Sequence, residues 1–260
     1  MLFFPQLSTG ASALYPVTKT SVQRTVLNTL GDGSTVGFPD PDAAALAWEL
    51  HASGMTLAEW TAIETLFQAT SGRWQTFTFL DPAGNLLAQS ETFGASAWTN
   101  GALIELTTGI DDPLGTTRAT RVVNAGSAPL AVAQTLGVPA NFEYCISVWA
   151  RTIAGSSVTL MIGTATQTFA LSTAWARISF STNLRSSDTP VTFGAQMIAG
   201  ASVDLWGMQV EAQLAPSDYK MTTANGGVYA NARFAEDQIT VTAQGTDVYD
   251  AVIRIVNTEN

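Results

Sequence analysis

The feature that most constrains this chain is a long run of short strand-like segments between Asn85 and Met221. The segments are rich in apolar and β-branched residues, and clusters of Gly, Ser, Pro and Asn separate them as turns do. No apolar stripe of helical spacing competes with this pattern. Short strands at such intervals are typical of a jelly-roll β-sandwich. Strands are expected near residues 103–106, 117–124, 131–136, 144–152, 157–163, 167–171, 175–182, 191–198 and 203–211.

The residues before this run predict a mixed domain with one helix. Thr56 and Glu59 have the spacing of a capping box, in which each side chain bonds the backbone N–H of the other residue. Ser71 and Gly72 are expected to end the helix, and residues 74–80 alternate in polarity as a half-buried strand does. Apolar residues recur on one stripe of the expected helix, at Leu57, Trp60, Ile63, Leu66 and Phe67.

Two segments nearer the N-terminus are also candidate strands. Residues 17–30 are rich in β-branched residues with rough alternation, which predicts a strand or a bent hairpin arm. Residues 43–51 leave two alternatives open. Their Ala, Leu and Glu content favours a helix, whereas the neighbouring segments favour a strand.

The pattern changes again after Met221. Residues 228–234, 238–243 and 248–256 alternate well, but they are too few to make an independent sheet. We therefore expect them to complete the sheet begun before Pro82, so that residues 1–84 and 222–260 form one discontinuous domain and residues 85–221 an insertion. The expected fold class is mainly β, with a split β-barrel or sandwich that carries one helix and an inserted jelly-roll β-sandwich.

The chain is acidic, with a formal net charge of −10. Such a surface repels phosphate backbones, so no specific nucleic-acid binding is expected. Twelve of the 21 acidic residues but only five of the 11 basic residues lie in the discontinuous domain. No apolar run reaches membrane-spanning length, and the N-terminus lacks the features of a signal peptide. The chain is expected to fold in a cytoplasm without a membrane partner.

The sequence offers little for metal or disulfide chemistry. Cys145 is the only cysteine, which excludes an internal disulfide and a Cys-rich zinc site. It lies in an apolar strand pattern, where a buried, inert thiol is expected. Asp204 is a conceivable calcium ligand, but one carboxylate does not make a site of roughly six to eight oxygens. Neither a metal nor a cofactor is expected.

Catalytic constellations are equally sparse. His51 is the only histidine, so a Ser-His-Asp triad would have to be built around it. A solvated or packed histidine is the simpler interpretation. Asp111-Asp112 and Glu236-Asp237 are adjacent carboxylate pairs of the kind that glycoside hydrolysis needs, but neighbours on a turn usually face different ways. We therefore expect no enzyme and no catalytic residue.

Two expected strands each place a tryptophan beside an arginine. Alternation puts Trp149 and Arg151 on the more polar face of one strand, and Trp175 and Arg177 on that of another. Sugars stack their C–H faces on aromatic rings while arginine bonds their hydroxyls. These four residues are therefore candidates for glycan binding. Alternatively, the rings pack against a covering loop or a neighbouring subunit. Trp206 is expected in the core with Met208 and Val210.

Several motifs of the insertion occur in an order found in a known group of domains. The segment resembles the carbohydrate-binding-module-like jelly rolls of phage tail and tail-fibre proteins, over about half of the chain. The motifs are Asn85-Leu86-Leu87, Ser90-Glu91-Thr92-Phe93, Ala97-Trp98-Thr99, YCISVWAR from Tyr144, TAWARI from Thr173, LWGMQVE from Leu205, and Asp218-Tyr219.

The flanking residues resemble phage tail-hub and distal tail proteins of the siphophage type. The motifs are Tyr15-Pro16-Val17, the segment around Trp48, Leu57-Ala58-Glu59-Trp60, Gly72-Arg73 and FTFLDP from Phe77. The resemblance implies a small β domain with one helix that pairs with further copies in a ring, typically a hexamer, at the end of the tail tube. Peripheral domains on such rings can bind host-surface saccharides.

The resemblance therefore implies a structural protein of the virion tail tip, assembled in the bacterial cytoplasm. Its expected partners are further copies of itself, the tail tube, other tail-tip and hub proteins, and a host-surface saccharide. The particle would be a phage or a phage-derived assembly. The acidic residues of the discontinuous domain would then face the channel. The alternative is a glycan-binding adhesin module without a ring-forming role.

Overall fold

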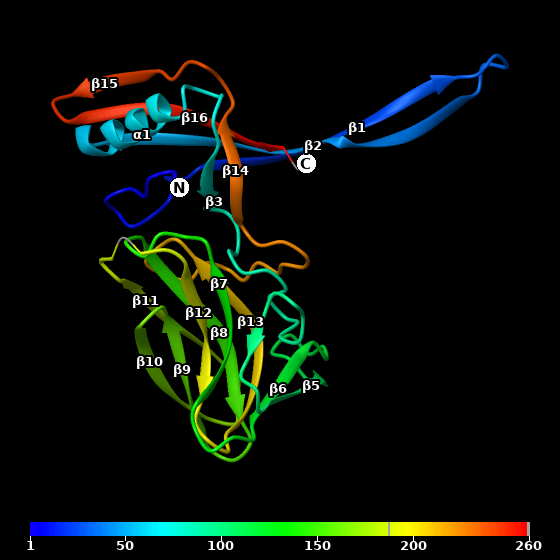
Figure 1. Cartoon of the computed structure of the whole chain (residues 1–260), viewed down its shortest axis with the longest axis vertical. Coiled ribbons are helices and arrows are strands. Elements are labelled where there is room, and N and C mark those ends of the chain that lie inside the picture. The colour runs from blue at the N-terminus through cyan, green and yellow to red at the C-terminus, as the bar shows by residue number, and fades with distance from the viewer. Residues whose placement is uncertain (187, 259–260) are drawn as a thin grey trace. The chain divides into compact units, whose positions relative to one another are not determined.

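The computed structural model describes residues 1–186 and 188–258, except for the side chains of residues 41–44 and 258. The chain divides into two compact units (Figure 1). Unit 1 comprises Met1–Ser8, Ser12–Phe79 and the C-terminal segment from Tyr229, whereas unit 2 comprises Thr9–Ala11 and Leu80–Val228. The expected fold class, mainly β with one helix and a jelly-roll sandwich, is confirmed.

Unit 1 is built on one sheet to which both ends of the chain contribute. The strand order is β1 (Val17–Thr29), β2 (Thr35–Met55), β16 (Val248–Thr258), β14 (Val228–Phe234) and β3 (Phe77–Leu80), with β15 (Val241–Gly245) beside β16. β16 pairs antiparallel with β2, with Ile253 opposite Leu50 and Ile255 opposite Trp48. The C-terminal strands β14 and β16 thus belong to the same sheet as β2 and β3.

Residues 43–51, for which helix and strand were both open, lie within β2. The sequence around Trp48 pairs with β1 on one side and with β16 on the other. Both ladders use backbone groups that a helix would have bonded internally. Tertiary pairing thus overrides the helical preference of Ala, Leu and Glu.

Helix α1 (Leu57–Ala69) begins at the predicted capping box. The Glu59 amide donates to Thr56 Oγ1 at 3.3 Å, and the Thr56 amide donates to Glu59 Oε2 at 2.8 Å. Trp60, Ile63 and Leu66 are buried in the core of unit 1. Leu57, which was predicted to belong to the same apolar stripe, is exposed. Ser71 and Gly72 have positive φ and end the helix as predicted. Among the described residues no helix is long and apolar enough to cross a membrane.

The strand predicted for residues 74–80 is shorter than expected. β3 covers only Phe77–Leu80, and all four residues are buried. The N-terminal segment pairs with the edge of this strand: the Phe4 amide donates to the Thr78 carbonyl, and the Thr78 amide donates to the Leu2 carbonyl. Trp74 lies outside the strand and is 71% exposed.

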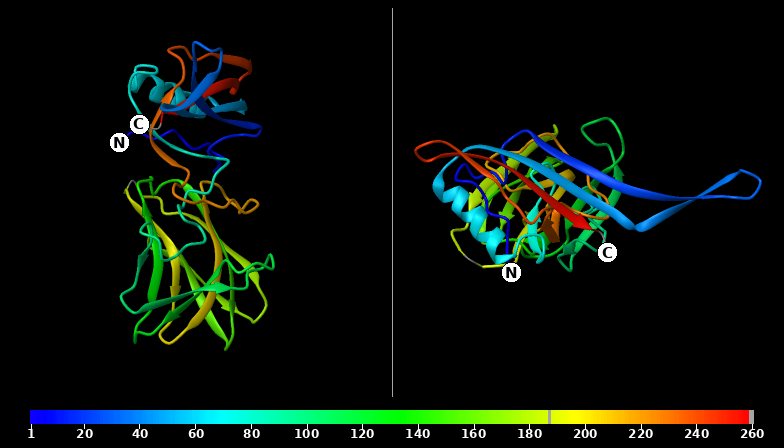
Figure 2. Two further views of the ribbon diagram at one scale, coloured as in Figure 1. Left: turned by 90° about the vertical axis from the view of Figure 1, so that its right-hand side faces the viewer. Right: turned by 90° about the horizontal axis from the view of Figure 1, so that it is seen from above.

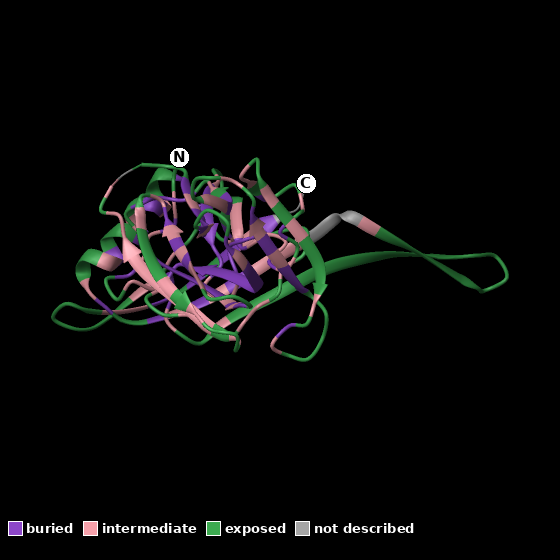
Figure 3. Cartoon of the chain, turned by 90° about the horizontal axis from the view of Figure 1, so that it is seen from below, coloured by how far each residue is buried: buried purple, intermediate pink, exposed green. Residues whose placement is uncertain are grey.

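The distal halves of β1 and β2 form a two-stranded arm, consisting of residues 24–29 and 35–40. Here the strands pair only with each other, because β16 joins β2 from Ala45 onward. The arm extends beyond the rest of unit 1 (Figures 1 and 3), and almost all of its residues are exposed. The hairpin arm predicted from residues 17–30 is confirmed.

Unit 2 is a sandwich of two five-stranded sheets (Figure 2). One has the order β10 (Ala165–Leu171), β9 (Ser156–Ile162), β12 (Val191–Met197), β7 (Leu130–Leu136), β4 (Thr99–Asn100). The other, which we call the outer sheet, has the order β11 (Ala176–Asn183), β8 (Glu143–Thr152), β13 (Ser202–Glu211), β6 (Ala119–Asn124), β5 (Ile104–Ile110). All nine strands predicted for this region are present. The two-residue strand β4 was not predicted, because so short a pairing leaves no pattern.

The two segments that lead into and out of unit 2 pair with each other. The Asp81 amide donates to the Gly227 carbonyl, and the Gly227 amide donates to the Asn85 carbonyl, both at 2.8 Å. A Cβ on Gly226 would lie 2.1 Å from the Leu86 carbonyl oxygen, so the close approach of the segments requires glycine there. An insertion is well tolerated where its two ends meet in this way.

Replacing Glu59 with Gln should destabilise unit 1 at neutral pH by about 1–2 kcal/mol. Burial opposes ionisation, but hydrogen bonds from Thr56 and Ser8 outweigh it and lower the pKa of Glu59 from 4.5 to about 2. Because the pKa is lower in the folded state, this stabilisation is present above pH 4.5 and is lost as the pH falls toward 2.

Hydrogen exchange of the α1 amides in both proteins, at neutral and at acidic pH, measures the effect. The difference between wild type and variant should shrink by more than half between pH 7 and about pH 3. A difference that is the same at both pH values would contradict the assignment.

Candidate functional site

The candidate site lies on the outward face of the outer sheet of unit 2. As predicted, Tyr144, Ile146 and Val148 of β8 point inward and are fully buried in the core. Trp149 and Arg151, on the opposite face of the same strand, point outward. Register places Arg177 of β11 opposite Trp149, and Trp206 of β13 opposite Trp149 on its other side. Trp175 immediately precedes β11, so all four predicted glycan-binding residues lie on this face.

One row across this face is built around a buried carboxylate. Asp204 is 1% exposed and is the register partner of both Arg121 and Arg151. Arg121 donates from Nε at 2.7 Å and from Nη2 at 3.1 Å, and Arg151 donates from Nε at 3.0 Å. These hydrogen bonds to Asp204 raise the pKa of Arg121. Both oxygens of Asp204, the conceivable calcium ligand, are thus taken by guanidinium groups. We call Arg121, Asp204, Arg151 and Trp175 the arginine row.

The row ends in a stacked pair. The guanidinium carbon of Arg151 lies 4.7 Å from the ring centroid of Trp175, within the range of a cation–π interaction. The Arg151 side chain is 25% exposed, and its two Nη groups have no acceptor in the part of the chain that the structure describes. The Nε1 of Trp175 also has no hydrogen-bond partner there. Because Trp175 Nε1 is itself buried, the donors that this end of the face can offer to a ligand are the Nη groups of Arg151.

The next row is covered. A segment of residues 212–222, which we call the strap, crosses the face over Trp206, Trp149 and Arg177. Arg177 lies over the Trp149 ring at 4.5 Å and donates from Nη1 to the Ser217 carbonyl at 2.6 Å. Burial lowers the pKa of Arg177. Trp149 and Arg177 thus pack against a covering segment, the alternative that the sequence left open.

Buried polar groups hold the strap in place. Glu211 is 3% exposed and accepts hydrogen bonds from the Ser217 amide at 3.0 Å and from Lys220 Nζ at 3.1 Å. The Lys220 amide donates to Gln209 Oε1 at 2.7 Å, and Ser181 Oγ donates to the Leu214 carbonyl at 2.7 Å. The strap is therefore an integral part of the fold.

The placement predicted for Trp206 is wrong in one respect. Trp206 is buried, but it lies on the outward face, with its ring 5.1 Å from Trp149 and 4.7 Å from Tyr219. Met208 is in the core between the sheets. A bulge between Trp206 and Gln209 changes the alternation, and Gly207 adopts the positive φ of 63° that it requires. The isolated glycine within the strand was the available signal.

Sequence reasoning did not identify Arg121. It pairs with Asp204 across 83 residues of sequence, and no local pattern shows which arginine faces a given carboxylate. The only available clue was position, because Arg121 alternates with Thr120 and Val122, which face inward and are buried.

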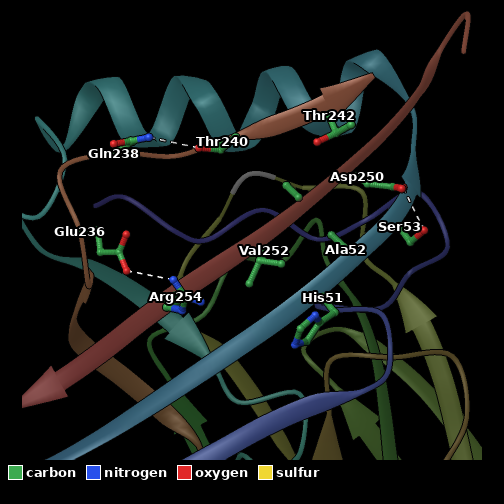
Figure 4. A pocket seen from close by; sticks show the side chains of 11 residues that line it. His51, Ala52, Ser53, Glu236, Gln238, Thr240, Thr242, Asp250, Val252 and Arg254 are labelled. Carbon is green, nitrogen blue, oxygen red and sulfur yellow. Dashed lines mark hydrogen bonds and ion pairs between the residues drawn. The ribbon is translucent and has the colours of Figure 1, made fainter. Parts of the chain in front are cut away.

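Unit 1 contains a polar pocket of about 460 Å³ on the sheet formed by β2 and β16 (Figure 4). His51 lies here, with Nε2 2.8 Å from Glu49 Oε1. Arg254 donates to the same Glu49 at 2.8 Å, while Ser53 Oγ donates to Asp250 at 2.9 Å. His51 is thus paired with a carboxylate, and Ser53 bonds a different group, so the two do not form a nucleophile–base pair.

The adjacent carboxylates serve separate partners. Glu236 pairs with Arg254 at 3.0 Å, whereas Asp237 pairs with Arg73 at 3.0 Å. Asp112 is buried and accepts hydrogen bonds from amides of its own loop, but Asp111 is exposed. Neither pair converges on one point, as glycoside hydrolysis would require.

Cys145 is buried, as predicted, and burial raises the pKa of its thiol. A high thiol pKa disfavours the reactive thiolate at neutral pH. Within the ranges that the structure describes, no group of three or more His, Cys, Asp or Glu residues is placed to hold a metal ion.

Known proteins resemble this chain in structure but not in sequence. No family model matches the sequence, and no curated protein matches it. One similar structure is a fragment of xylanase 10B from Clostridium thermocellum, with its CBM22-1 and GH10 modules, in complex with xylohexaose. The TM-score is 0.38 and the sequence identity 14%. The similarity covers 49% of this chain and 27% of that one. The C-terminal family 22 carbohydrate-binding module of Clostridium thermocellum Xyn10B is similar at a TM-score of 0.42 and 15% sequence identity. This similarity covers 53% of this chain and 99% of that one.

An enzymatically active domain of tailspike protein 4 from bacteriophage CBA120 is similar at a TM-score of 0.39 and 10% identity. The similarity covers 51% of this chain and 22% of that one. The chain thus spans only about a quarter of the first xylanase fragment and of the tailspike. At such identities and TM-scores, what those proteins bind does not transfer to this chain.

The two kinds of tryptophan on the outer sheet should differ in their effect on stability. Trp206→Ala should lower the free energy of unfolding of unit 2 by about 3–5 kcal/mol, because it removes a fully buried ring from between Trp149 and Tyr219. Trp175→Ala should lower it by less than about 1 kcal/mol, because Trp175 is partly exposed. Calorimetric unfolding of the full chain measures both, and equal losses would show that Trp175 is a structural residue.

Proposed function

We propose that unit 2 is a glycan-binding module whose site is the open end of the outer sheet, at Trp175 and Arg151. The observation that carries this proposal is the stacked pair itself. Its guanidinium is partly exposed and keeps two Nη groups without an acceptor among the described residues. An aromatic ring beside unused donors is what a sugar needs, because its C–H face is apolar while its hydroxyls accept hydrogen bonds.

The pair is also held in position before any ligand arrives. Arg151 is fixed by its bond from Nε to the buried Asp204 and by the Trp175 ring. A side chain that is already ordered loses little conformational entropy on binding. Trp149 and Arg177, the other two predicted residues, would support this site from beneath the strap and would not themselves contact the sugar.

Trp175→Ala should reduce binding of the full chain to host-surface polysaccharide at least tenfold, because it removes the stacking surface. Retention on immobilised polysaccharide, measured with whole-cell adsorption, tests this. Trp74→Ala is the matched control, since Trp74 is an exposed tryptophan of unit 1 and its loss should have no effect. Unchanged binding by a folded Trp175→Ala protein would rule out this site.

We further infer that unit 1 assembles into a ring at the tail tip of a phage or phage-derived particle, as the motifs around Trp48 and Trp60 suggest by resemblance. A specific feature favours assembly, namely the arm. Val26 and Phe38 are opposite each other in the ladder, with exposures of 42% and 51%. A two-stranded ribbon is marginal alone, and in the part of the chain that the structure describes β1 is the edge strand of the sheet, so its outer edge can pair with a neighbour.

In this proposal the arm of one copy lies against the next, and rotational symmetry closes the ring. The ring would be hexameric, would stack on the tail tube and would hold unit 2 at its periphery. Acidic residues of unit 1 would face the channel, where they would repel passing DNA.

Replacing both Val26 and Phe38 with Ser should prevent assembly, because it removes the apolar face of the arm while keeping the ladder. Light-scattering mass and negative-stain imaging across concentrations measure the outcome. Wild type should reach a closed ring, and the double variant should stay monomeric. Trp74→Ser removes an exposed apolar side chain away from the arm and should assemble normally. Rings formed by the double variant would exclude the arm as the interface.

A further inference from the structure

The arginine row is a basic feature in an acidic protein. The chain has a net charge of −10, but in this row two guanidinium groups face one carboxylate. Arg121 is flanked across the sheet by Thr107, an uncharged residue. Among the described residues neither guanidinium forms an ion pair with a second carboxylate, so the ion-paired group of Arg121, Arg151 and Asp204 has a formal charge of +1. Local charge of the sign opposite to the whole protein points to a ligand of negative charge.

The unused donors are arranged for a planar anion. Asp204 takes the Nε of Arg151 and the Nε and Nη2 of Arg121. Both Nη groups of Arg151 and the Nη1 of Arg121 have no acceptor in the described part of the chain. Both side chains are partly exposed, at 25% and 29%. A carboxylate can accept two parallel bonds from one guanidinium, and such charge-assisted bonds are about twice as strong as those of a neutral hydroxyl.

Resting on the glycan-binding function proposed for unit 2, we propose that its ligand is an acidic saccharide. A carboxylate of the sugar, as in a uronic acid, pairs with the free Nη groups of Arg151 and lies near Arg121. The sugar ring packs beside Trp175. One uronic acid residue supplies both the negative charge and the apolar face that the row can accept.

Arg177, which also lies on this face, takes no part. Arg177 donates to the Ser217 carbonyl and, from Nη2 at 3.0 Å, to Ser147 Oγ. The strap covers it. The specificity for an acidic sugar thus depends on Arg151 first and on Arg121 second.

The test compares an oligogalacturonate with its methyl ester, in which esterification removes the charge of the carboxylate; both are titrated calorimetrically into the full-length chain. The acid should bind at least tenfold more tightly than the ester, and added salt should weaken the binding of the acid alone. Arg151→Gln should lower the affinity for the acid at least tenfold and should change the affinity for the ester little. Asp204 keeps its two bonds from Arg121 in this variant, so the fold should survive.

Arg185→Gln is the matched control, because Arg185 is an exposed arginine of unit 2 outside the row. It removes the same charge from the same unit and should leave both affinities unchanged. If Arg185→Gln weakened the binding of the acid as much as Arg151→Gln does, the loss would come from the change in overall charge, and the proposed pairing would be wrong.

The remaining outcomes separate this inference from the function on which it rests. Equal binding of acid and ester, with both lost in Trp175→Ala, would overturn the acidic class and leave glycan binding intact. Binding of neither probe, nor of glucuronate- and sialate-containing oligosaccharides, would overturn both. The protein could instead bind a glycerol-phosphate wall polymer through Arg151 and bind no carboxylated sugar. That outcome would overturn the carboxylate as the ligand group and identify a phosphate in its place.

Discussion

The ladder between β2 and β16 is the interaction on which the rest of the structure depends. It joins the N-terminal and C-terminal parts of the chain, and it carries Trp48, Leu50, Ile253 and Ile255 into the core of unit 1. β2 continues past the point where β16 joins it and becomes one side of the arm. The body of unit 1 therefore anchors a ribbon that could not persist alone. The same ladder makes unit 2 an insertion, because residues 80–228 lie between the strands that it brings together.

Much of this architecture could be predicted from sequence, because it is recorded locally. The capping box of Thr56 and Glu59 marks the start of α1, and apolar segments between turn clusters mark nine of the ten strands of unit 2. The prediction failed where long-range packing decides. Residues 74–76 alternate like a strand but lie in the turn after α1, where the Gln75 amide donates to the Thr70 carbonyl, and the N-terminal segment pairs with the edge of β3. The ambiguity of residues 43–51 was resolved only by the strands on both sides.

The candidate site shows the same division between local and distant information. Alternation correctly placed Trp149, Arg151 and Arg177 on one face, because strand periodicity is a local property. It could not show that the strap covers Trp149 and Arg177, since residues 212–222 have no periodic pattern to mark their path. Nor could it show Arg121 beside Asp204. The bulge at Gly207 puts Met208 and Val210 in the core while Trp206 stays on the outward face with Asp204, and the single glycine was the only indication of it.

The two proposed roles depend on each other through valency. The proposed contact at the open end of the outer sheet consists of one tryptophan and one arginine, which form a stacked pair. A contact of this size gives weak affinity, because association first costs translational and rotational freedom. In a ring of identical copies, however, each further contact to the same polysaccharide is intramolecular, and avidity can exceed a single affinity by roughly 10² or more. A repeated acidic glycan would supply equivalent sugars at regular spacing. A modest site on an assembling unit is therefore sufficient for attachment, and each single contact can still be released.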